Sequence, residues 1–402
     1  MAPRPTVLLA ASCLPVLTGA TLSPALPKLQ EAFPDHPELW IKLLLSLPAL
    51  GMALGAPVAG RLGDRFGPSR VLRLSILAYG FCGLAGFAAT SLAALLVIRA
   101  IQGIAVAGAL TSATTLLGSH WQGSARQRLL GSQAAAMSLA GVVALLIGGT
   151  LAQWHPRGPF LVFLLPWLLI PVLPSHQEDR ETHPFALPAL KIRQVIWPCL
   201  TAGLGMMLFY QIPVQVPFLL KQLDGTGPQG TAIALAVATF ISAWSSRRHA
   251  FLEARWSLAA RFCLLFGLLG AGQWIIAISA NRWQVGGGLI VASLGMGLLL
   301  PTLHGWILHW APPGRRGGEI GRLQGALYLG QFLAPPAGQQ LWHWGGPGTL
   351  FAVSGAALVT LALASFGLRF RTHSSSHSSS HSPSHWESNL ERKSGGDQRP
   401  SN

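Results

Sequence analysis

The chain has 402 residues, of which half are hydrophobic and only 10% are charged. Soluble domains carry about a quarter charged residues to cover their surface, so this composition excludes an ordinary water-soluble globular protein. The net charge of +15 does not indicate nucleic-acid binding, because the basic residues stand in short clusters between apolar runs and not on one compact domain.

Apolar runs follow one another almost end to end, and a helix of about 20 such residues crosses a hydrocarbon core. We therefore predict an all-α integral membrane protein with twelve transmembrane helices. The first run follows Arg4 like a signal peptide, but it continues to Leu26 without a clear small-residue cleavage site, so we interpret it as an uncleaved first span. The predicted spans are 6–27, 41–62, 70–90, 92–118, 128–153, 159–174, 195–220, 229–246, 257–280, 283–309, 317–341 and 348–370.

The connecting loops differ in basic charge. If both termini are cytoplasmic, the inner loops carry seventeen Lys and Arg residues and the outer side carries five. Basic residues in short loops stay on the cytoplasmic side. The sequence therefore predicts a multi-pass protein of the cell (inner) membrane, in contact with the lipid bilayer, with both termini cytoplasmic.

The loop between the second and third spans reads Gly-Arg-Leu-Gly-Asp-Arg-Phe-Gly-Pro-Ser-Arg over residues 60–70. Its glycines permit a tight turn and close backbone approach. Asp64 is the one acid among basic residues, and it can pair with Arg65 or Arg70 or lie at a helix N-terminus. Such a cluster can hold one conformation closed and release it in another, whereas the simpler alternative is an ordinary basic loop.

The fourth span contains Arg99 within the run Arg-Ala-Ile-Gln-Gly over residues 99–103. An arginine inside an apolar helix costs at least about 2.5 kcal/mol on insertion scales and normally faces the bundle interior. The alternative is a side chain that extends outward to the membrane interface.

Both motifs resemble those of the major facilitator superfamily, and the resemblance extends over about 6–370. It implies alternating access by rocking of two six-helix bundles. Among its branches the chain is most similar to the twelve-span bacterial drug:proton antiporters of the bicyclomycin-resistance kind, although the Gly-Pro of their fifth-span motif is replaced by Ala144-Leu145. By this resemblance the gating residues are Gly60, Leu62, Gly63, Asp64, Arg65, Gly67 and Arg70, and the coupling residues include Arg99, Gln102 and Gly103.

An internal repeat supports two pseudo-symmetric six-helix bundles. His120-Trp121 and the basic loop after it recur about 190 residues later as His309-Trp310 and a second basic loop, and parallel repeats of this kind are common in transporters. We predict an N-terminal bundle over 1–174, a cytoplasmic linker over 175–194, a C-terminal bundle over 195–370 and a disordered His/Ser-rich tail over 371–402. Weak metal binding by the tail is the alternative to a low-complexity segment.

No Asp or Glu falls near the middle of a predicted span, although proton-coupled transporters usually place a carboxylate there. Proton coupling would then depend on Arg99, His304 or Asp64, or the driving ion is different. His304 titrates in the appropriate range, and the alternative is a histidine that is merely hydrogen-bonded.

Substrate contacts are expected from polar and aromatic residues that face a central cavity, and interhelical hydrogen bonds are the alternative role for each glutamine. Because Arg99 is the only strongly charged residue expected among them, neutral, amphipathic or anionic cargo is favoured over polycations. The candidates are Gln133 and Met137 in the fifth span, Tyr210, Gln211 and Gln215 in the seventh, and Gln324, Tyr328 and Gln331 in the eleventh.

The leading hypothesis is export of small amphipathic molecules or drugs by proton antiport. Uptake of a small metabolite by symport or uniport is the main alternative, and a receptor or scaffold without transport is a third. No Ser/His/Asp, metal-ligand or nucleotide-binding constellation occurs, so we expect no enzymatic activity, no cofactor and no metal site. The expected partners are a small-molecule substrate and a coupling ion, and the expected state is a monomer.

Overall fold

The structure is a computed structural model that describes residues 4–121, 123–173, 192–310 and 316–374. These residues form helices and connections, without a strand. The helices are α1 (Pro5–Ala11), α2 (Leu14–Ala20), η1 (Ser23–Ala25), α3 (Leu26–Ala32), α4 (Glu38–Phe66), α5 (Pro68–Ala88), α6 (Leu92–His120), α7 (Gly123–Trp154), η2 (Gly158–Val172), α8 (Ile192–Phe209), α9 (Gln211–Asp224), α10 (Pro228–Ser246), α11 (His249–Arg255), α12 (Leu258–Ala277), α13 (Arg282–Trp310) and α14 (Arg316–Ser374).

Nine helical stretches of the described residues are long and apolar enough to cross a membrane. The ninth, within α14, is interrupted at Gly345 and Gly346, where the φ of 74° at Gly346 is a left-handed value that suits glycine, so it contains two crossings. The shorter apolar η2 and the helix α10 supply the remaining two. The prediction of an all-helical membrane protein with twelve spans is therefore confirmed.

Two spans are broken where the sequence has prolines. The first is divided into α1, α2, η1 and α3, and each of these pieces begins with a proline in its first turn. The seventh is divided at Tyr210 into α8 and α9, and Pro213 follows the break. Proline lacks the backbone N–H that continues a helix, so these prolines favour the breaks.

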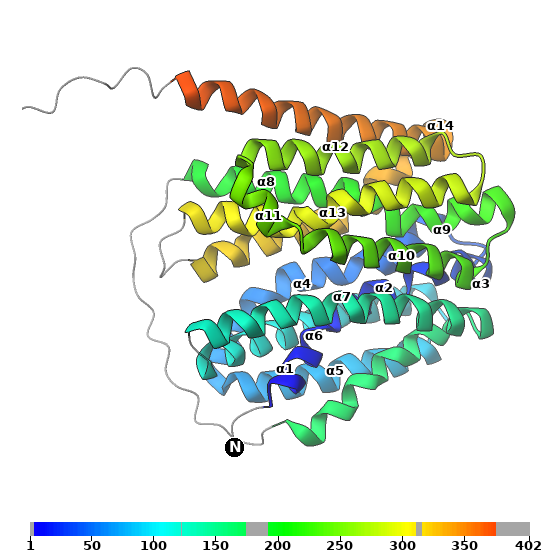
Figure 1. Cartoon of the computed structure of the whole chain (residues 1–402). Helices are drawn as coiled ribbons and strands as arrows, with labels where there is room; N and C mark the ends of the chain where they lie inside the picture. Colours follow the sequence, from blue (N-terminus) through cyan, green and yellow to red (C-terminus); the bar gives the residue numbers. More distant parts are fainter. Residues whose placement is uncertain (1–3, 122, 174–191, 311–315, 375–402) are drawn as a thin grey trace, which may run out of the picture.

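The two halves of the chain repeat the same helix pairings. In the N-terminal half α4 packs on α6, and in the C-terminal half α10 packs on α13. Likewise α5 packs on η2, and α12 packs on the last part of α14. Figure 1 shows the two sets of helices as two layers that lie side by side, with α7 beside α10 along their boundary.

Glycines allow the closest crossings. A Cβ at Gly103 of α6 would lie 2.2 Å from the carbonyl oxygen of Pro48 in α4, and a Cβ at Gly297 of α13 would lie equally close to the carbonyl oxygen of Ser242 in α10. Neither position has room for a side chain, because real Cβ contacts are not this short. Small residues at crossings are how membrane helices gain packing contacts, since lipid provides no hydrophobic drive for association.

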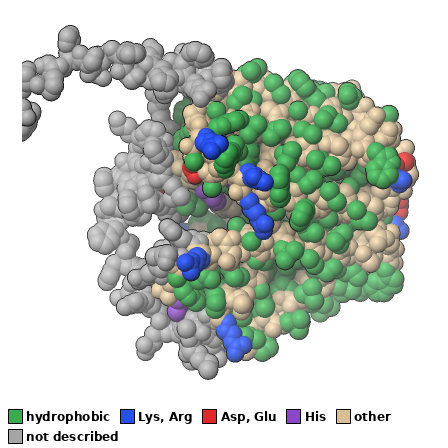
Figure 2. All heavy atoms as spheres, in the orientation of Figure 1, with side chains coloured by type: hydrophobic (Ala, Val, Ile, Leu, Met, Phe, Trp, Pro, Cys, Tyr) green, Lys and Arg blue, Asp and Glu red, His purple; other side chains and the backbone are tan. Residues whose placement is uncertain are grey.

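We call the two ends of the bundle the linker end, where η2 ends and α8 begins, and the far end, which holds the connections after α3 and α9 (Figure 1). Figure 2 shows mostly hydrophobic side chains over the middle of the visible face, with charged side chains toward the two ends. An apolar belt between charged ends is the surface that a bilayer requires.

Candidate functional site

Arg99 of α6 is completely buried inside the N-terminal half. Its Nε donates to the carbonyl oxygen of Leu44 in α4 at 2.6 Å, and one terminal nitrogen donates to the carbonyl oxygen of Thr18 in α2 at 2.8 Å. The other terminal nitrogen donates to Gln102 Oε1, one turn along α6. The guanidinium therefore ties together the first, second and fourth spans, and it does not extend to the membrane interface.

Aromatic groups complete the surroundings of Arg99. The guanidinium carbon lies 5.5 Å from the ring centroid of Phe163 in η2, and Thr18 Oγ1 lies 3.2 Å from the hydroxyl of Tyr79 in α5. The hydroxyl of Tyr210 lies close to Gly19 of α2, where an added Cβ would be 3.1 Å from it. No Asp or Glu within the described residues forms an ion pair with Arg99, so this region is a buried positive centre bordered by hydroxyl groups and rings.

Gln102 and Gly103, the other predicted coupling residues, lie beside this centre. Gln102 is completely buried and accepts from Arg99 through Oε1, while its Nε2 has no partner among the described atoms. Gly103 is the close crossing point of α6 with α4. Gln102 therefore orients the guanidinium, and Gly103 sets the distance between the second and fourth spans. The coupling role of these residues stays a prediction.

The loop motif of residues 60–70 lies at the linker end, where α4 ends and α5 begins. Gly67 has a φ of 85° and makes the turn, as expected for glycine. A Cβ at Gly60 or Gly63 would meet no atom within 4 Å, so close backbone approach is not realised at these two positions. Asp64, Arg65 and Arg70 are exposed, and Asp64 joins no ion pair between described residues. Leu62 is also exposed.

Two of the five predicted substrate residues in the seventh and fifth spans are hydrogen-bonded within the bundle. Gln211 Nε2 donates to the carbonyl oxygen of Ala334 in α14 at 2.7 Å, and Gln133 Nε2 donates to Ser12 Oγ at 2.7 Å. Gln215 is completely buried, and both of its side-chain polar atoms lack a partner among the described atoms. Met137 is half-buried.

The three predicted substrate residues of the eleventh span lie on α14. Gln324 Nε2 donates to the hydroxyl of Tyr328 at 3.2 Å, and Tyr328 packs in the same apolar cluster as residues of the N-terminal half. Gln331 is half-buried. His304 of α13 is half-buried, and its Nε2 has no hydrogen-bond partner among the described atoms.

A charged cluster at the linker end of the C-terminal half was not predicted. It is built on the short helix α11, where Glu253 accepts from Arg261 at 3.1 Å and lies 3.8 Å from His249 Nδ1, while His249 Nε2 lies 3.3 Å from the same arginine. Burial of the ring lowers the pKa of His249; Glu253 opposes this shift and Arg261 adds to it. The basic run around residues 247–261 was the sequence signal for it.

Between described residues, three polar contacts join the two halves, and all lie in the far half of the bundle. Ser23 Oγ donates to the carbonyl oxygen of Pro213 at 2.5 Å, Lys221 Nζ lies 2.6 Å from Glu31 Oε1, and Lys42 Nζ donates to Gln339 Oε1 at 2.6 Å. In the same far half of the bundle α7 packs on α10, where Gly149 is in contact with Ala232 and Pro228. The halves are thus joined at the far end.

Two six-helix halves that meet around buried polar groups are an architecture of membrane transporters. The family model of the Major Facilitator Superfamily matches residues 8–262 and 250–394. The chain belongs to this superfamily, and the family prediction is confirmed.

Several curated proteins are similar to this chain. The puromycin resistance protein pur8 of Streptomyces alboniger is 31% identical over 37% of this chain and 29% of its own length. The 4-hydroxybenzoate transporter PcaK of Pseudomonas putida is 28% identical over 50% of this chain and 53% of its own length. The class E tetracycline resistance protein of Escherichia coli is 26% identical over 71% of this chain and 73% of its own length. The chain thus matches about half or less of the first two relatives.

Among solved structures, a bacterial homologue of the human lysosomal transporter Spinster superposes with a TM-score of 0.68 at 15% identity, covering 90% of this chain and 94% of the other. At this identity the likeness extends to the fold alone.

The linker 175–194 and the His-rich tail 371–402 lie almost wholly outside the described residues, so the predicted domain boundaries and the metal-binding alternative stay predictions.

Proposed function

We propose that this protein exports small amphipathic molecules or drugs in exchange for protons, by alternating access of one central site to the two sides of the membrane. The relatives favour export over uptake. The tetracycline resistance relative matches about seven tenths of both chains, whereas the 4-hydroxybenzoate transporter matches about half. The bicyclomycin-resistance branch stays a hypothesis within this proposal.

We further propose that the protein resides in the cell (inner) membrane with both termini cytoplasmic and acts as a monomer. The excess of basic residues at the linker end supports this orientation. The far end is then the outer side, and the contacts of Ser23, Glu31 and Lys42 with the C-terminal half correspond to a conformation closed to the outside.

The single observation that carries the mechanism is the position of Arg99. It is completely buried, its partners are two backbone carbonyls and an amide, and it has no carboxylate partner among the described residues. A positive charge held in this way favours neutral or anionic groups nearby and repels polycations. The bond to Thr18, in the broken first span, can respond when that span moves with bound cargo.

Proton exchange then requires a titratable group other than a membrane carboxylate. We propose Arg99 with Gln102 and Gly103 as the conformational link, and His304 or Asp64 as the group that exchanges the proton. The unpartnered Nε2 of His304 supports its inclusion, since a buried nitrogen without a partner is available to a ligand or water. The completely buried Gln215, the hydrogen-bonded pair Gln324 and Tyr328, and the remaining predicted substrate residues are proposed to line the path.

Uptake of a small metabolite by symport or uniport is the second candidate function. The observation that favours it is Ala144-Leu145, which stands where drug antiporters carry Gly-Pro in the fifth span. The similarity to a 4-hydroxybenzoate transporter points in the same direction.

Transport by purified protein in liposomes tests the proposal. With an imposed pH gradient, we expect amphipathic dyes or antibiotics to accumulate on the side from which protons move, and the accumulation to collapse when a protonophore dissipates the gradient. Asp64→Asn should slow this exchange strongly, because the gating loop loses its acid. Transport that ignores the gradient would remove proton coupling from the proposal.

The direction is tested separately in a drug-sensitive host that lacks its own pumps. Expression should lower the accumulation of some member of a panel of dyes and antibiotics, and Asp64→Asn should restore it. If accumulation of every compound is unchanged while a nutrient enters faster, uptake is the function.

A further inference from the structure

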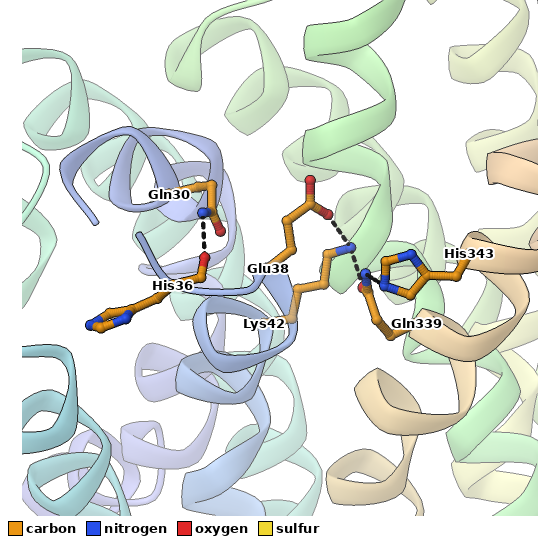
Figure 3. Close-up of polar contacts among 6 residues, drawn as sticks. All are labelled: Gln30, His36, Glu38, Lys42, Gln339 and His343. Carbon is orange, nitrogen blue, oxygen red and sulfur yellow. Dashed lines mark hydrogen bonds and ion pairs between the residues drawn. The ribbon is translucent and has the colours of Figure 1, made fainter. Parts of the chain in front are cut away.

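Lys42 is completely buried although it lies in the first turns of α4, next to the far end. Its Nζ donates to Glu38 Oε2 at 2.8 Å and to Gln339 Oε1 at 2.6 Å. Figure 3 shows the lysine between Glu38 of its own helix and Gln339 of α14, with His343 beside the amide on the side away from the lysine. His343 Nε2 lies 3.1 Å from Gln339 Nε2 and fixes the orientation of that amide.

Two aromatic rings complete the surroundings of the ammonium group. Lys42 Nζ lies 4.6 Å from the ring centroid of Phe218 in α9 and 4.6 Å from that of Trp342 in α14. A desolvated cation within 6 Å of an aromatic ring is attracted by the negative face of the ring. We use the name ammonium cage for Gln339, Phe218 and Trp342, all of which belong to the C-terminal half.

We propose that the ammonium cage is a binding site for a primary ammonium group, and that its occupation by Lys42 of the opposite half holds the far end closed. This inference rests on the proposed function only in that the far end has to open during a transport cycle. Glu38 and Lys42 lie on the same helix and move together. When the halves separate, the lysine therefore keeps Glu38 and gains water, but it loses the amide and both rings.

The burial of Lys42 distinguishes it from Lys221, whose ion pair with Glu31 also joins the two halves. The side chains of Lys221 and Glu31 are 42% and 53% exposed, so water screens their attraction and the pair contributes little. Lys42 is shielded from water, where interactions with a charge are stronger. The closed far end should accordingly depend on Lys42 and hardly on Lys221.

Thiol labelling of a buried reporter measures the opening without any need for transport. Val214 is completely buried, lies one turn before Phe218 on α9, and packs in a cluster with residues of the N-terminal half. In Val214→Cys, a membrane-impermeant thiol reagent is applied to each side of membrane vesicles in turn. The parent chain, without Val214→Cys, gives the baseline labelling rate of the four native cysteines.

In the Val214→Cys background we expect Lys42→Ala to raise the labelling rate from the far-end side about tenfold, which corresponds to the loss of a desolvated cation–π and amide interaction. The matched control Lys221→Ala should change the rate by less than about twofold. Gln339→Leu, which keeps the lysine and removes its acceptor, should also raise the rate.

Chemical rescue tests the cage itself. Ethylammonium replaces the missing head group, so it should return the labelling rate of Lys42→Ala toward that of the parent, while sodium chloride at equal concentration should not. Restoration also shows that the variant is folded. An unchanged rate in Lys42→Ala, or an increase that ethylammonium does not reverse, would overturn the proposal, and neither result depends on whether the protein transports drugs.

Discussion

The guanidinium of Arg99 donates to two carbonyls that the helices leave open. The carbonyl of Leu44 would normally accept from the N–H of residue 48, which is Pro48 and has none. The carbonyl of Thr18 lies in the last turn of α2, where the N–H of Leu22 donates to Gly19. Removing the arginine therefore leaves these carbonyls without a donor among the described residues, although it also removes a buried charge that has no carboxylate partner there.

We predict that Arg99→Met lowers the midpoint of thermal unfolding in detergent only modestly, because each buried carbonyl left without a donor costs about 1–3 kcal/mol, while loss of the unpaired buried charge offsets part of that cost. Transport should fall about tenfold or more, since each lost charge-assisted hydrogen bond is worth about 1.5–3 kcal/mol and 1.4 kcal/mol is tenfold in rate. Thermal unfolding and liposome transport are measured on the same preparation. A large drop in the midpoint with unchanged transport by the folded fraction would make Arg99 a structural brace only.

His249 gives the C-terminal half a dependence on pH. Because burial lowers its pKa in the folded state, the unfolded chain binds more protons once the pH falls below about 6.5, and stability should decline from that point downward. We predict that the unfolding midpoint decreases between about pH 7 and pH 5.5, and that His249→Gln reduces the slope. A slope that is equal in parent and variant would contradict the assignment to this residue.

At the scale of the residue, the sequence located Arg99 but not its partners. Its acceptors are backbone carbonyls, which leave no mark in a sequence. Lys42 was missed for a different reason, because its position at the start of the second predicted span, 41–62, places it with the charges of the outer side. The spacing of Glu38 and Lys42, four residues apart, was the available signal, but nothing in the sequence indicates that Gln339 lies opposite.

The helices themselves could be predicted more fully, because hydropathy and length determine a membrane span. The predicted span 229–246 agrees within one residue with α10 at Pro228–Ser246. The predicted span 41–62 lies within α4, which extends over Glu38–Phe66. The breaks at Tyr210 and at Gly345 depend on packing as well as on proline and glycine. The helix α11 is only seven residues long, which is too short for an apolar periodicity to predict it.

The crossing of α4 and α6 gives a prediction for the helical elements. Gly103→Leu should lower the free energy of unfolding by about 1–3 kcal/mol or prevent folding, because overpacking forces backbone shifts and a Cβ there would lie 2.2 Å from the carbonyl oxygen of Pro48. Gly267→Leu is the matched control, since a Cβ at Gly267 of α12 meets no atom within 4 Å. Folded yield and thermal midpoint are the measurements. Equal effects of both substitutions would contradict the close crossing.

For the whole molecule, alternating access requires the two halves to part at the far end. We predict that Glu31→Cys with Lys221→Cys, joined by a short bismaleimide, stops transport, because the link spans the two halves. The same reagent on Asp224→Cys with Arg282→Cys should leave most of the transport, because this pair lies within the C-terminal half at the same end. Transport that survives the first cross-link would exclude separation of the halves at this point.

The 3₁₀ winding of η2 limits which sequence changes the sixth span can tolerate. Its 15 residues are wound as a 3₁₀-helix, which rises about 2.0 Å per residue and so reaches about 30 Å, where an α-helix of equal length would reach about 22 Å. With three residues per turn, Phe160 and Phe163 stand one above the other, against Gly86 and Gly83 of α5. Deleting a single residue would turn every later side chain by a third of a revolution and shorten the crossing, so natural variants of this segment should differ in residue type but keep its length.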